Sequence, residues 1–75
     1  MNTTQQLLDR AKAQIGAESD YRLAKTLHWN PATVSSYRTG RSQIDSNGLF
    51  VLAELLGMSH GETLATWAAI EAERA

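Results

Sequence analysis

The chain has 75 residues, a hydrophobic content of 43% and a formal net charge of −1 at pH 7. A chain this short buries too little surface to combine a sizeable core with a deep catalytic cavity. Cysteine is absent, which excludes a disulfide framework and thiolate zinc sites. No apolar run approaches the roughly 20 residues that span a bilayer, and the amino terminus lacks the pattern of a signal peptide. We therefore expect one cytoplasmic domain over residues 1–75.

The first two predicted elements are helices. A capping box of Thr3 and Gln6 opens the first helix, and Gly16 ends it. Its inward face is predicted to consist of four apolar residues at helical spacing: Leu7, Leu8, Ala11 and Ile15. Ser19 is the expected N-cap of a second helix, which runs to about Leu27.

The next helix follows after a link of only three residues, His28, Trp29 and Asn30. Asn30 is the expected N-cap, and Pro31 falls in the first turn, where a missing N–H is harmless. Gly40 is expected to stop this helix. The short link predicts that the second and third helices pack against each other at an angle.

Two further helices are predicted in the second half of the chain. Asp45 opens the fourth and Gly57 ends it, with the inward residues Leu49, Leu52, Ala53 and Leu56. A capping box of Ser59 and Glu62 opens the fifth, over about 60–73, with the apolar stripe Leu64, Trp67 and Ile70. No segment alternates with a period of two for long enough to predict a strand, so the expected fold class is all-α.

Four residues in segment 19–40 have a specific spacing: Ala24, Asn30, Val34 and Gly40. With this spacing the segment resembles the helix-turn-helix of the lambda-repressor and Cro-type DNA-binding family. The resemblance implies a compact five-helix domain of a small phage-type regulator, whose second motif helix enters a DNA major groove. The chain departs from the family pattern at the turn, where His28 replaces the usual glycine. A positive φ is expected there, which costs histidine more than glycine.

Charge is distributed unevenly along the chain. Between Tyr21 and Ile44 all charged residues are basic: Arg22, Lys25, Arg38 and Arg41. From Asp45 onward acidic residues dominate. A basic end suits a module that faces phosphates, although a small protein can also show such asymmetry by chance.

The resemblance implies two sets of DNA contacts. Base contacts are assigned to small residues on the outward face of the third helix, Ala32, Ser35 and Ser36. Backbone contacts are assigned to Arg38, Thr39, Arg41, Ser42 and Gln43, with Arg41 the strongest candidate. Ser19 is a further candidate, because the free N–H groups at the start of the second helix can hold a phosphate. Since no Gln, Asn or Arg lies on the outward face, sequence reading is expected to depend partly on DNA shape and water. The alternative is an ordinary solvated Ser/Thr face.

No enzymatic chemistry is expected. His28 and His60 lack metal-ligand spacing, and Ser35 and Ser36 lack a nucleophile motif. We expect no metal, no cofactor, no small-molecule substrate and no membrane association.

The sequence therefore predicts a transcriptional regulator that binds double-stranded DNA sequence-specifically and represses by occluding a promoter. A homodimer on DNA is expected through Leu64, Trp67 and Ile70, although this stripe can equally close the core of the domain itself. The alternative function is a protein-binding regulator, such as an inhibitor or antitoxin-like module, on the same scaffold.

Overall fold

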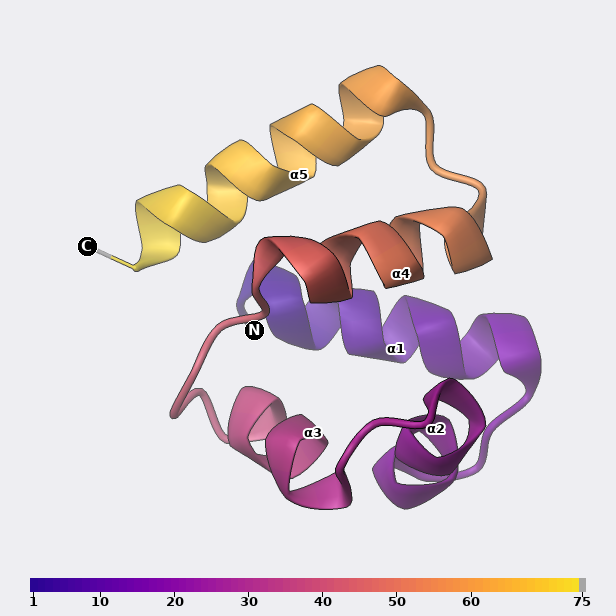
Figure 1. The fold of residues 1–75 in the computed structure, drawn as a ribbon. Coiled ribbons are helices and arrows are strands. Elements are labelled where there is room, and N and C mark those ends of the chain that lie inside the picture. Colours follow the sequence, from indigo (N-terminus) through magenta and orange to yellow (C-terminus); the bar gives the residue numbers. More distant parts are fainter. Residues whose placement is uncertain (75) are drawn as a thin grey trace.

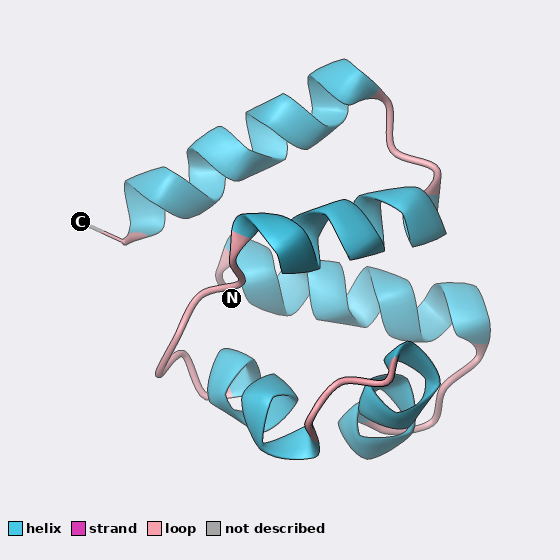
Figure 2. Ribbon diagram, in the orientation of Figure 1, coloured by secondary structure: helices cyan, strands magenta, loops and turns pink. Residues whose placement is uncertain are grey.

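The computed structural model describes residues 1–74, and these form five helices. They are α1 (Thr3–Ile15), α2 (Asp20–Leu27), α3 (Pro31–Arg38), α4 (Ser46–Leu56) and α5 (His60–Glu73). The described residues contain no strand, so the prediction of an all-α chain is confirmed (Figure 2). None of the helices has the length and apolar character required to cross a membrane.

Helix α1 is the centre of the fold. The other four helices all pack on it, and they form two pairs, α2 with α3 and α4 with α5 (Figure 1). Between the pairs, no Cα atom of α4 comes within 8 Å of α2 or α3. The α2–α3 pair and the α4–α5 pair are therefore joined by α1 and by side-chain contacts. We call the boundary between the two pairs the seam.

The core draws on every helix. Its fully buried or nearly buried apolar residues are Leu7, Leu8, Ala11, Leu23, Ala24, Val34, Tyr37, Ile44, Leu49, Leu52 and Ile70. Ile15, Leu27 and Leu56 pack at its edge. Ile44 is fully buried although it lies in the link between α3 and α4, so it anchors this link to the core.

The start of α1 differs from the prediction. Asn2 is the N-cap: its side chain accepts a hydrogen bond from the Gln5 N–H at 2.8 Å, and its own N–H donates to Gln5 Oε1 at 2.9 Å. The expected box of Thr3 and Gln6 is therefore wrong by one residue. Thr3 instead donates its hydroxyl to Glu73 Oε2 at 2.6 Å, a contact across 70 residues that local spacing cannot reveal.

The other four helices begin at the predicted N-caps, Ser19, Asn30, Asp45 and Ser59. In each, the side-chain oxygen accepts from a backbone N–H of the first turn. At α5 only half of the expected capping box is seen, because the carboxylate of Glu62 lies 3.7 Å from Arg10 Nη1.

The turn after α2 has the expected strained conformation. His28 has φ 60° and ψ 33°, and it is the one non-glycine residue with a positive φ in the described chain. Its N–H donates to Lys25 O at 3.2 Å, and the Trp29 N–H donates to Ala24 O at 2.8 Å. This Schellman pattern satisfies the last carbonyls of α2 and turns the chain sharply into α3.

Replacing His28 by glycine is expected to leave the protein as stable or to stabilise it, because glycine adopts this conformation without a Cβ penalty. Thermal melts of the purified variant measure the effect. Gly57→Ala is the matched control: Gly57 ends α4 with φ 65° and open space around it, so alanine there meets only backbone strain and should cost about 1 kcal/mol. Clear destabilisation by His28→Gly would show that the imidazole makes a contact worth more than the strain.

Candidate nucleic-acid interface

Helix α3 buries one face and exposes the other. Val34 is completely buried and Tyr37 nearly so. The predicted base-contacting residues lie on the outward side, where Ala32 and Ser35 are exposed and Ser36 is half-buried. All three are short, so this face allows close approach of a flat or grooved partner.

The chain reverses at the end of α3 through a second Schellman turn. Gly40 has φ 79°, its N–H donates to Tyr37 O at 3.2 Å, and the Arg41 N–H donates to Ser36 O at 3.0 Å. Arg41 and Ser42 are left exposed directly beyond the helix. Thr39 is also exposed, and its hydroxyl donates to Ser36 O at 3.2 Å.

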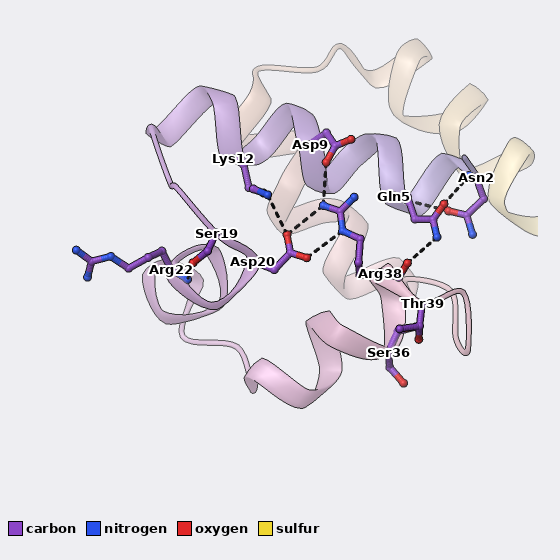
Figure 3. Close-up of polar contacts among 10 residues, drawn as sticks. All are labelled: Asn2, Gln5, Asp9, Lys12, Ser19, Asp20, Arg22, Ser36, Arg38 and Thr39. Carbon is purple, nitrogen blue, oxygen red and sulfur yellow. Dashed lines mark hydrogen bonds and ion pairs between the residues drawn. The ribbon is translucent and has the colours of Figure 1, made fainter.

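Arg38, a predicted phosphate contact, is engaged in ion pairs within the fold. Its guanidinium makes two hydrogen bonds to Asp20, from Nε at 2.9 Å and Nη2 at 3.0 Å, and Nη2 also lies 2.8 Å from Asp9 Oδ1 (Figure 3). Lys12 Nζ is 3.3 Å from the same Asp20 carboxylate. The hydrogen bond from Arg38 is the main reason why the pKa of Asp20 lies below its usual value. The charge of Arg38 is thus compensated within the fold by two carboxylates, from α1 and α2, while its contact with DNA backbone stays a prediction.

Gln43 is also engaged within the fold. Its side-chain oxygen accepts a hydrogen bond from the hydroxyl of buried Thr4, which in turn accepts from the Ile44 N–H at 3.4 Å. This hydrogen bond attaches the α3–α4 link to α1, while the assignment of Gln43 to backbone contact stays a prediction. Ser19 caps α2 at the other end of the region, which leaves its hydroxyl hydrogen free to donate.

Three exposed cations remain in the basic segment: Arg22, Lys25 and Arg41. None of them forms an ion pair with a residue of the described chain. Arg22 points away from the ion-pair cluster (Figure 3), and with Lys25 and Glu18 it lines a hollow at the link between α1 and α2. Of the three, Arg41 is the cation that follows the end of α3 in the chain.

The three residues of the predicted dimer stripe differ in exposure. Ile70 is completely buried in the core, so its assignment to an interface is wrong. Trp67 is half-buried beneath Arg74, whose guanidinium carbon lies 5.3 Å from the ring centroid. Leu64, by contrast, is 57% exposed. Leu64 and Ile70 are six residues apart, which places them about 120° apart around an α-helix, so α5 buries Ile70 and leaves Leu64 at the surface.

A neighbouring aromatic residue was missed. Phe50 on α4 is 63% exposed, and with Leu64 and Trp67 it lines an apolar hollow of about 100 Å³ between α4 and α5. The sequence contained a signal for this, because the predicted inward residues Leu49 and Leu52 place Phe50 outward by helical spacing.

No group of three or more metal-binding side chains is found within residues 1–74. No family model, curated protein or solved structure matches the chain. The geometry of α3 and its flanking turns is thus the basis for assigning a function.

Proposed function

We propose that α2 and α3 form a helix-turn-helix and that the protein is a sequence-specific, double-stranded DNA-binding regulator, a phage-type repressor that occludes a promoter. The observation that carries this proposal is the three-residue link with His28 in the left-handed conformation. It sets α3 against α2 at a sharp angle and leaves the small side chains of α3 on the surface, as insertion into a major groove requires.

Sequence reading is proposed to come from Ala32, Ser35 and Ser36, with Ser19, Thr39, Arg41 and Ser42 on the sugar–phosphate backbone. Exposure of the first two and partial exposure of Ser36 support this division. Short hydroxyl side chains discriminate bases weakly, so DNA shape and bridging water are proposed to contribute to specificity.

Arg41→Ala is expected to weaken binding to all duplexes by roughly tenfold, the cost of one charge-assisted contact. The slope of log affinity against log salt should flatten by about one unit, because one phosphate is no longer neutralised. Gel-shift titrations at several salt concentrations, on a duplex selected from a random library, measure both quantities. Arg22→Ala is the matched control, since it removes the same charge at the α1–α2 link and should change the slope less. Equal slopes for wild type and Arg41→Ala would contradict the phosphate role.

A homodimer on DNA is part of the proposal, with Leu64 and Phe50 in place of Ile70. One copy offers a single free cation beside α3, and two copies on a two-fold axis double the backbone contacts and read two half-sites. The exposed Phe50 ring next to an apolar hollow supports this surface, because a two-fold contact can place each ring against the partner's hollow.

Leu64→Asp is expected to convert a complex of two proteins per selected duplex into one, with at least a tenfold loss of affinity for the full site, because it places a charge in an apolar contact. Sedimentation velocity with and without DNA measures the stoichiometry. Ala65→Asp is the control, since Ala65 is exposed on the same helix but does not line the hollow. A wild-type complex of one protein per site at saturation would contradict the dimer.

The alternative, a protein-binding inhibitor or antitoxin-like module, is favoured by the same Phe50 surface and by the small number of free cations beside α3. A purified protein that shifts no duplex at low salt, from a random pool, would support this alternative over DNA binding.

A further inference from the structure

The seam between the two helix pairs contains a cavity of about 350 Å³. This volume lies within the range of small-molecule sites, which is about 300–1,000 Å³. Trp29, Asn30 and Tyr37 line it from the α2–α3 turn and α3. Asp45, Asn47 and Val51 line it from the start of α4. A molecule held here would contact both halves of the protein.

The lining combines aromatic rings with a carboxylate. Trp29 and Tyr37 are arranged edge to face, with ring centroids 6.4 Å apart and an interplanar angle of 85°. Asp45 Oδ1 accepts from the Gly48 N–H at 2.7 Å, which leaves Oδ2 available at the cavity. No Lys or Arg lines the cavity itself. The nearby Arg74 guanidinium is held outside it by a hydrogen bond to Ile44 O at 2.7 Å.

The Tyr37 hydroxyl adds a polar group to the cavity lining. The residue is nine-tenths buried, and its hydroxyl, which forms no hydrogen bond within segment 1–74, remains accessible to solvent. Burial and the nearby Asp45 carboxylate raise the pKa of Tyr37 above its ordinary value, against the opposing effect of the Arg74 guanidinium. The phenol therefore stays neutral at physiological pH and is free to donate or accept one hydrogen bond to a ligand.

We propose that this cavity binds a small organic cation of the alkylammonium or alkylguanidinium class. Asp45 Oδ2 accepts from the cationic head, the Trp29 and Tyr37 rings attract the positive charge, and Val51 covers the alkyl part. An anion of the same size is repelled by Asp45, and a neutral molecule gains neither the ion pair nor the cation–π attraction. Because the α2–α3 turn lines the site, an occupant would also reach the DNA-binding helix, a consequence that rests on the proposed function.

Three probes with the same alkyl chain test the site without DNA: n-butylammonium chloride, 1-butanol and sodium butyrate, at constant ionic strength. Amide NMR titrations follow residues 28–30 and 47–51 and the Trp29 indole. We expect butylammonium to shift these signals with a dissociation constant at least fivefold below that of butanol, and butyrate to leave them unchanged. Equal affinities of wild type for butylammonium and butanol, or shifts confined to other residues, would overturn the proposal whatever the variants show.

Two variants locate the charge effect. Asp45→Asn keeps a good N-cap for α4 but removes the carboxylate charge, so the preference for butylammonium over butanol should fall below twofold. Glu54→Gln removes the same charge from exposed α4 surface outside the cavity and should keep the preference. An equal loss in both variants would assign the effect to the overall charge of the protein and contradict the site.

Discussion

Ile70→Ala is expected to lower the free energy of unfolding by about 3 kcal/mol, which places it among the most damaging single changes in this chain. The Ile70 side chain has no exposed surface and packs within the central cluster, so alanine loses apolar burial and leaves a cavity. In a domain of this size the melting temperature should fall by roughly 12–24 °C. Urea denaturation followed by circular dichroism measures the free energy directly.

Leu64→Ala is the matched comparison on the same helix. Leu64 is 57% exposed, so its truncation should change the stability of the monomer by no more than about 0.5 kcal/mol. The cost of Ile70→Ala should also be independent of protein concentration, since a core contact belongs to one chain. If the loss of unfolding free energy caused by Ile70→Ala became smaller on dilution, Ile70 would have to lie in an interface between copies.

The helices of this protein were predictable because their ends carry local signals. Ser19, Asn30, Asp45 and Ser59 each cap a helix through a hydrogen bond to a residue two or three positions ahead. The strained turn at His28 was predictable from the resemblance, because the helix-turn-helix pattern usually has glycine at this position.

The candidate site was less predictable because the internal partners of its residues are distant in sequence. Arg38 looks like a free cation until α1 and α2 bring Asp9 and Asp20 to it. Gln43 looks like a surface loop residue until α1 brings Thr4 within hydrogen-bonding distance. The sequence thus showed which residues carry charged or polar groups. It did not show which of these groups form hydrogen bonds or ion pairs within the fold.

Arg38→Ala is expected to cost about 2 kcal/mol of unfolding free energy at neutral pH, because the guanidinium makes paired hydrogen bonds to Asp20 and a further contact to Asp9. These contacts join α3 to both α1 and α2 (Figure 3). Nearby, Gln5 Nε2 donates to the backbone oxygen of Arg38 at 2.7 Å, so the backbone of α3 stays attached to α1 in the variant. The loss should therefore report on the ion pairs. Arg38→Lys, which keeps the charge but loses the paired geometry, should recover only part of it.

The cost of Arg38→Ala should also depend on pH in a defined direction. The folded state lowers the pKa of Asp20 from 3.8, chiefly through the hydrogen bond from Arg38. A lowered carboxyl pKa stabilises the folded protein fully above the unfolded value, and this contribution disappears as the pH falls through the folded value. The difference in unfolding free energy between wild type and Arg38→Ala should thus be constant above about pH 5 and shrink as the pH falls below 3.8. Glu73 also has a lowered pKa, through hydrogen bonds from Thr3, but it is retained in both proteins and cancels in the difference. Urea titrations across this range decide the matter, and a difference that stays constant down to about pH 2 would show that Asp20 gains nothing from Arg38.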